Sequence, residues 1–173
     1  FITSDMGFHS ESWKSLRHFY REKGAIGSKA FPKTCTDRLK IKPIYSFLEA
    51  YLADRYGVKN HKKQGIREFA AVHGKIQMMI GIAKGEEKRV SDSSQSPQRW
   101  FRESIQTIYP LIDLGMDRQA CQEYLHNKNL YVIPSNCKCC PFLSLPELEY
   151  LRRFPSNDLK DWVGLEAAKL TKH

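Results

Sequence analysis

The chain has 173 residues, 41% of them apolar, and a formal net charge of +9. This length suffices for one domain with a buried core, and the positive charge favours an anionic partner such as a nucleotide or nucleic acid. No apolar run approaches the roughly 18 residues of a membrane span, no signal-peptide pattern opens the chain, and the cysteine count of five is odd. We therefore expect a cytoplasmic protein without a disulfide framework and without a membrane partner.

The first third of the chain predicts a strand followed by helices. Residues 1–7 form a short apolar, β-branched run that ends in an acidic, glycine-containing turn, which predicts a buried strand. Apolar residues at helical spacing then predict helices over 11–23 and 42–56, the second with Pro43 in its first turn. A strand that leads into a helix is typical of α/β proteins.

The middle third repeats this pattern. A short helix is expected at 65–72, and the run 76–82 is apolar enough to be the second buried strand. The polar stretch 91–97 contains nothing that can anchor it to a core, so we interpret it as a mobile loop. Residues 109–112 are expected to be extended.

The last third predicts helices. Asp117 is well placed to cap the N-terminus of the first of them. Alternation of strands and helices predicts an α/β fold with a mainly parallel, Rossmann-like sheet flanked by helices within 1–115, followed by a helical, cysteine-containing segment of the same domain within 116–173. Helices in this segment are expected over 118–127, 146–153 and 158–172.

A Cys-x-x-Cys motif on a proline-bounded turn is the most informative feature of the chain. Cys137 and Cys140 lie three positions apart and can bind one metal centre, and Cys35 and Cys121 complete a set of four, with Cys139 left over. Four thiolates suit a [4Fe–4S] cluster or tetrahedral Zn²⁺, and their dispersed spacing favours the cluster. The alternative is that these cysteines are small buried apolar residues.

Several motifs follow one another in an order that resembles a known family. Asp5 and Gly7 form an Asp-x-Gly turn, 35–43 places a cysteine before a Lys-apolar-x-Pro helix start, and 81–89 reads Gly-Ile-x-x-x-Glu-x-x-Arg. A Tyr-Pro-Leu-Ile segment and the cysteine turn follow within 109–142. In this order the motifs resemble the iron–sulfur branch of the adenine nucleotide α-hydrolase-like and sulfonucleotide (PAPS) reductase family.

The resemblance implies a HUP-type, Rossmann-like fold that binds ATP with Mg²⁺ beyond the carboxyl ends of the strands. There the Asp5–Gly7 turn and Glu86 would hold Mg²⁺ or ribose, and Lys40 and Arg89 would neutralise phosphate charge. It further implies cleavage of ATP to AMP and pyrophosphate, with the adenylyl group activating a substrate oxygen that sulfur then displaces. DNA or tRNA would be the acceptor, and a cysteine desulfurase would supply the sulfur. Ordinary capping or solvated roles are the alternative for these side chains.

Three departures from the family pattern keep two other functions open. The phosphate-binding loop, Ser-Gly-Gly-x-Asp-Ser, is absent and is expected upstream of Phe1. Ala83 stands where the family has an arginine, which leaves Lys84 and Arg89 as the cations of that motif. The Glu-Cys-Gly-x-His tail of the assimilatory reductases is also absent, which argues against thiol-dependent reduction. The alternatives are a sulfonucleotide reductase and a non-catalytic nucleic-acid or partner-binding module with a degenerate nucleotide site.

Overall fold

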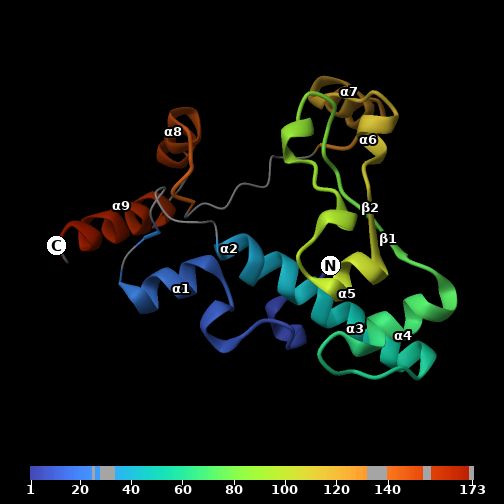
Figure 1. Cartoon of the computed structure of the whole chain (residues 1–173). Helices are drawn as coiled ribbons and strands as arrows, with labels where there is room; N and C mark the ends of the chain where they lie inside the picture. Colours follow the sequence, from blue (N-terminus) through green and yellow to red (C-terminus); the bar gives the residue numbers. More distant parts are fainter. Residues whose placement is uncertain (25, 28–33, 132–139, 154–156, 172–173) are drawn as a thin grey trace. The chain divides into compact units, whose positions relative to one another are not determined.

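The computed structural model divides into two compact units, which we call the terminal unit (Phe1–Phe47 with Pro134–His173) and the central unit (Leu48–Ile133) (Figure 1). The described part is mixed α/β, mostly helical, with one small parallel sheet. None of its helices is both long and apolar enough to cross a membrane. The structure describes residues 1–24, 26–27, 34–131, 140–153 and 157–171.

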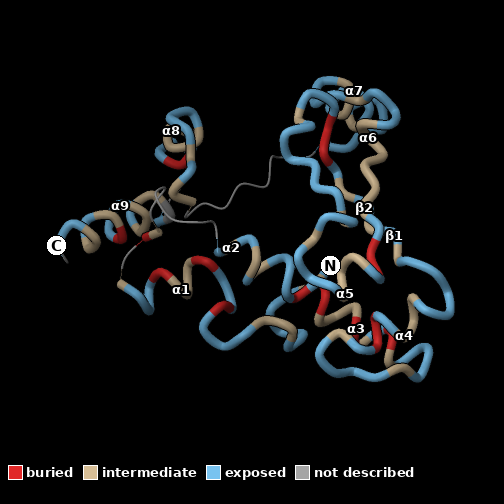
Figure 2. The backbone as a smooth tube through the Cα atoms, in the orientation of Figure 1, coloured by how far each residue is buried: buried red, intermediate tan, exposed pale blue. Residues whose placement is uncertain are grey.

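The terminal unit is built from short helical pieces around one apolar cluster. Trp13, Leu16 and Tyr20 are buried in it together with Ile26 and Leu165, and Figure 2 marks these buried positions in red. The Ile26 backbone N–H donates to the Leu165 carbonyl at 3.4 Å. Its elements are 3₁₀ turns Ser4–Met6 and Glu11–Trp13, helices α1 Leu16–Lys23 and α2 Thr34–Thr36, a π-helical turn Asp37–Ile41, the first part of α3 Lys42–Tyr56, α8 Leu145–Arg153 and α9 Asn157–Leu170.

The strand predicted for residues 1–7 is wrong. Phe1 is fully exposed, and Ser4–Met6 forms a 3₁₀ turn that Gly7 closes in the left-handed region at φ 79°. A β-branched run forms a strand only where a neighbouring strand pairs with its backbone. Among the described residues, no strand pairs with residues 1–7.

The predicted helix over 42–56 is confirmed as α3, but the chain is already helical before Pro43. Pro43 has no N–H to donate to the Leu39 carbonyl four residues earlier, and its ring would clash with that carbonyl in a regular helix. The wider turn Asp37–Ile41 precedes it, and π turns of this kind relieve such a clash. The His9 Nε2 lies 3.2 Å from the Leu39 carbonyl oxygen, so His9 donates the hydrogen bond that Pro43 cannot.

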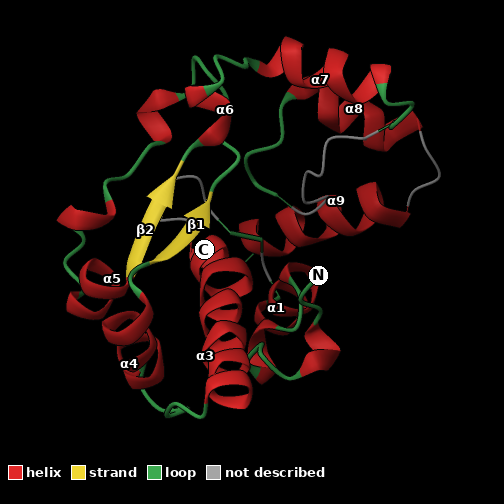
Figure 3. Ribbon diagram, turned by 90° about the vertical axis from the view of Figure 1, so that its right-hand side faces the viewer, coloured by secondary structure: helices red, strands yellow, loops and turns green. Residues whose placement is uncertain are grey.

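The central unit holds the sheet. Strands β1 Ile76–Met79 and β2 Ile105–Ile108 run parallel, with Ile76 opposite Ile105 (Figure 3). Ile66 and Ile105 are completely buried in its core. The other elements of the unit are the rest of α3, α4 Gln64–His73, 3₁₀ turns Glu87–Arg89 and Ser93–Gln95, α5 Arg99–Ser104, α6 Pro110–Asp113 and α7 Arg118–Asn127.

The sheet differs from the one predicted. The strand expected over 76–82 exists but ends at Met79, and β2 was not predicted. The residues 109–112, expected to be extended, begin helix α6 because Pro110 occupies its first position, where the missing N–H costs nothing. A mainly parallel α/β sheet is thus seen only as one pair of strands in the described residues.

Two glycines within helices should respond in opposite ways to alanine. A Cβ added at Gly65 in α4 would lie 1.9 Å from the Lys59 carbonyl oxygen, whereas one at Gly164 in α9 would meet nothing within 4 Å. Gly164→Ala should therefore raise the free energy of unfolding by about 1 kcal/mol, the helix preference of alanine over glycine. Gly65→Ala should lower the free energy of unfolding by about 1–3 kcal/mol, because the Lys59 carbonyl belongs to the backbone and cannot move away as a flexible side chain could. Urea unfolding followed by circular dichroism measures both, and a stabilised Gly65→Ala variant would contradict this packing.

Candidate functional site

The segment that follows β1 is fixed against the segment that follows β2. The Ile80 N–H donates to the Ile108 carbonyl at 2.9 Å, and the Lys84 N–H donates to the Met116 carbonyl at 2.8 Å. Between them Ile82 is buried. Because the carboxyl ends of parallel strands lie at the same edge of a sheet, this edge is where an open α/β sheet places its ligands.

Glu86 holds two arginines together at this edge. Arg118 donates to Glu86 Oε1 through Nε at 2.9 Å and Nη2 at 2.6 Å, and Arg89 Nη1 donates to Glu86 Oε2 at 2.9 Å. The hydrogen bonds from Arg118, with the charges of both arginines, hold the pKa of the Glu86 carboxyl below its usual range. The Arg89 and Arg118 side chains are 62% and 77% exposed, so their remaining N–H groups face solvent. Two guanidinium groups share one carboxylate, so the group of three side chains carries one surplus positive charge.

The serine segment 91–97 is anchored by Thr107 of β2 and by Tyr109, the residue after β2, so the interpretation that nothing can anchor it is wrong. The Tyr109 hydroxyl donates to the Ser91 carbonyl at 2.8 Å and accepts the Ser91 N–H at 3.0 Å. Thr107 Oγ1 also donates to the Ser91 carbonyl, at 3.1 Å, and the Thr107 N–H donates to Ser93 Oγ at 3.3 Å. One partner lies in a strand that was not predicted, and the other directly follows it.

A cavity of about 470 Å³ lies between the serine segment and the sheet. Inside it the Asp92 carboxylate accepts the Ser94 N–H at 2.8 Å and the Ser94 hydroxyl at 2.7 Å, which lowers the pKa of Asp92. Burial favours a higher pKa for Tyr109, but its hydrogen bonds with Ser91 outweigh that effect and the pKa is lowered. Hydroxyls dominate the lining, which consists of Lys75, Val90, Ser91, Asp92, Ser93, Ser94, Gln106, Thr107 and Tyr109.

The five predicted nucleotide-binding residues belong to different units. Glu86 and Arg89 are in direct contact in the central unit. Asp5, Gly7 and Lys40 belong to the terminal unit, where Asp5 and Lys40 are exposed. A hydrogen bond from the Thr3 side chain lowers the pKa of Asp5. Sequence reasoning did not include Arg118 as a site residue, nor the hydroxyls of the cavity, whose only sequence signal was the run of serines.

The predicted metal ligands are described only in part. Cys35 is half-buried against the apolar cluster of the terminal unit, and Cys121 is half-buried on α7 in the central unit. Cys140 is half-buried and its sulfur accepts the Phe142 N–H at 3.4 Å. Cys137, like Cys139, lies outside the described residues. Where the structure describes the chain, no three Cys, His, Asp or Glu side chains are grouped to hold a metal ion, and the cluster stays a prediction.

The edge of the sheet combines features that bind phosphorylated ligands. Two exposed guanidinium groups can each form paired hydrogen bonds to phosphate oxygens, and the neighbouring hydroxyls can bind a sugar. Both oxygens of Glu86 accept hydrogen bonds from the two arginines, and both oxygens of Asp92 accept from Ser94, so the predicted role of Glu86 in holding Mg²⁺ or ribose stays a prediction. Comparisons with protein-family models, with curated proteins and with solved structures find no match for this chain.

Proposed function

We propose that this protein is an ATP pyrophosphatase, similar to the PAPS reductase family, that adenylates a substrate for sulfur transfer. One observation carries the proposal: Glu86 holds Arg89 and Arg118 together at the carboxyl-end edge of the parallel pair β1–β2. The residues that line the hydroxyl-rich cavity include Val90 and the serine segment, which come directly after Arg89 in the chain. Nucleotides bind at this edge in open α/β sheets.

The proposed reaction requires positive charge at this edge of the sheet. A substrate oxygen attacks the α-phosphorus of ATP, the bond to pyrophosphate breaks, and AMP remains on the substrate. Arg89 and Arg118 would stabilise the negative charge of the departing pyrophosphate, and Mg²⁺ bound with ATP supplies further charge neutralisation. A sulfur nucleophile delivered by a cysteine desulfurase then displaces AMP. The net charge of +9 suits DNA or tRNA as the acceptor.

The cysteines would form the second functional element. Cys35, Cys121, Cys137 and Cys140 would hold a [4Fe–4S] cluster, with Zn²⁺ as the alternative. When bound, such a cluster supplies either a redox centre or a structural cross-link between distant parts of a chain.

Release of pyrophosphate from labelled ATP tests the proposed function. We expect release that depends on Mg²⁺ and increases when single-stranded DNA or tRNA is added. Reduction of adenosine 5′-phosphosulfate with thioredoxin, without pyrophosphate release, would instead identify a sulfonucleotide reductase. Nucleic-acid binding with neither reaction would identify a binding module, and either result would overturn the proposal.

A further inference from the structure

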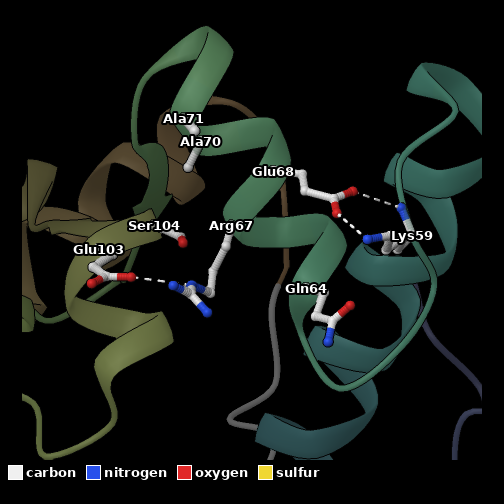
Figure 4. A pocket seen from close by; sticks show the side chains of 8 residues that line it. All are labelled: Lys59, Gln64, Arg67, Glu68, Ala70, Ala71, Glu103 and Ser104. Carbon is white, nitrogen blue, oxygen red and sulfur yellow. Dashed lines mark hydrogen bonds and ion pairs between the residues drawn. The ribbon is translucent and has the colours of Figure 1, made fainter.

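A second cavity of the central unit lies between α4 and α5. Its volume is about 670 Å³. Figure 4 shows side chains of both helices around it, with the Ser104 hydroxyl turned toward the side of Arg67. It shares no lining residue with the cavity beside the serine segment. The lining residues are Lys59, Gln64, Arg67, Glu68, Ala70, Ala71, Glu103 and Ser104.

The charges in the wall of this cavity already neutralise one another. Arg67 Nε lies 3.1 Å from Glu103 Oε2, and Lys59 Nζ lies 3.3 Å from Glu68 Oε1. The Lys59 N–H also donates to Glu68, at 3.1 Å. Glu103 also accepts a hydrogen bond from Arg99 Nε, outside the lining, at 2.6 Å. Both cations and both carboxylates of the lining are therefore already paired, and none of them is left over for a charged ligand group, which favours an uncharged group inside.

The groups left over are neutral hydrogen-bonding groups. Ser104 is fully buried, and its hydroxyl has no hydrogen-bond partner among the described residues. A buried hydroxyl without a partner costs about 1–3 kcal/mol, which a ligand that bonds to it recovers. The Gln64 side-chain amide also has no partner in the described chain and can donate and accept. Ala70 and Ala71 add a small apolar surface against which a flat ring can pack.

A basic loop lies directly before α4 at the rim. Lys59, His61 and Lys62 are exposed, and the structure gives the side chains of His61 and Lys62 no ion pair or hydrogen bond within its described part. Lys63 instead donates to the buried Glu49 carboxylate at 3.1 Å, which fixes the end of the loop. Lys62, a cation without a carboxylate partner in the described chain, is available for phosphate.

We infer that this cavity receives one unpaired base of a single-stranded nucleic acid, whose phosphates follow the loop 59–63. A nucleobase is flat, uncharged and edged with donors and acceptors, as the Ser104 hydroxyl, the Gln64 amide and the alanine surface require. The inference deepens the proposed function, on which it rests for its biological role, by naming the acceptor that the second cavity binds. DNA and RNA share this base chemistry.

Ser104→Ala is the first test. Fluorescence anisotropy with labelled DNA and RNA strands of about twelve nucleotides measures binding in the absence of ATP. We expect the variant to bind about 3- to 10-fold more weakly, the effect of one lost hydrogen bond. Its melting temperature should not fall, because the hydroxyl has no partner to lose within the described residues. If Ser104→Ala fails to fold, Gln64→Ala, at an exposed position, replaces it and should weaken binding similarly.

Lys62→Ala separates the phosphate contact from the base contact. It should weaken binding to all strands and reduce the slope of log K against log salt concentration by about 0.7, whereas Ser104→Ala should leave the slope unchanged. Lys160→Ala removes the same charge from an exposed position of α9 and should change neither affinity nor slope beyond the small effect of net charge.

The outcomes distinguish this inference from the proposed function. Undetectable binding of single strands by the wild-type protein, or equal affinity of wild type and folded Ser104→Ala, overturns the base site. Pyrophosphate release from ATP is measured separately, so it can persist when the base site is overturned. Loss of pyrophosphate release with normal strand binding overturns the proposed function alone. Tighter binding of the DNA or the RNA series identifies the source of the base.

Discussion

Replacing Arg118 by alanine should weaken ATP binding about 10- to 100-fold, because a hydrogen bond to a charged group contributes about 1.5–3 kcal/mol. Arg118 supplies the surplus positive charge of the Glu86 group, and its removal leaves Glu86 and Arg89 as a neutral pair. The Arg118 side chain is 77% exposed, so the fold should tolerate its loss. Isothermal titration with Mg²⁺–ATP measures the affinity, and pyrophosphate release should fall in parallel.

Arg152→Ala is the matched control for this variant. Arg152 forms the same kind of two-pronged contact with Glu149 on α8, through Nε at 2.7 Å and Nη2 at 2.7 Å. Its removal changes the net charge equally but leaves the edge of the sheet intact. Equal weakening of ATP binding by Arg118→Ala and Arg152→Ala would show that only overall charge matters, and the strand-end site would then be rejected.

The elements that could be predicted from the sequence are those specified by local signals. The helix over 118–127 is confirmed as α7, and Asp117 caps it by accepting the Ala120 N–H at 2.8 Å. The helix over 42–56 is confirmed to the residue as α3. Helical periodicity and N-caps involve residues only a few positions apart, so they can be recognised in the sequence.

The strands were harder because their pairing is not local. β2, Ile-Gln-Thr-Ile, is rich in β-branched residues but only four residues long, and it becomes a strand by pairing with β1 nearly thirty residues earlier in the chain. Residues 1–7 begin with an aromatic and two β-branched residues, yet without a partner in the described chain they form a turn. The same non-local pairing supplies the hydrogen bonds that Thr107 and Tyr109 give to the serine segment.

The candidate site was partly legible for a related reason. Glu86 and Arg89 lie three residues apart in one motif, so their contact follows from local spacing. Arg118 is 32 residues from Glu86 and is the first residue of α7. Its contact with Glu86 therefore depends on the tertiary structure and not on local spacing. The unpartnered hydroxyl of Ser104 had no sequence signal at all, because serine at a helix end is usually solvated.

Cys140→Ser should abolish the visible absorbance of protein purified without oxygen and should remove its iron. A hydroxyl is a poor substitute for a thiolate as a ligand of an iron–sulfur cluster, so loss of one of four ligands should release the cluster. Cys139→Ser is the matched control: it changes a neighbouring cysteine that the four-ligand set does not use, and it should leave colour and iron content unchanged. Iron and acid-labile sulfide analysis measure the result, and zinc in place of iron would identify the alternative metal.

For variants of Cys35, metal content and not stability is the measurement that tests whether the sulfur is a ligand. Its half-buried side chain packs against the apolar cluster of Trp13, Leu16 and Leu165, so Cys35→Ser should destabilise the terminal unit even if the sulfur binds no metal. Cys35→Ala avoids burying a hydroxyl and separates the two roles. If Cys35 is a ligand, the alanine variant loses iron as completely as Cys140→Ser. Full iron content in folded Cys35→Ala, or equal loss of iron in Cys139→Ser and Cys140→Ser, would reject the set of four.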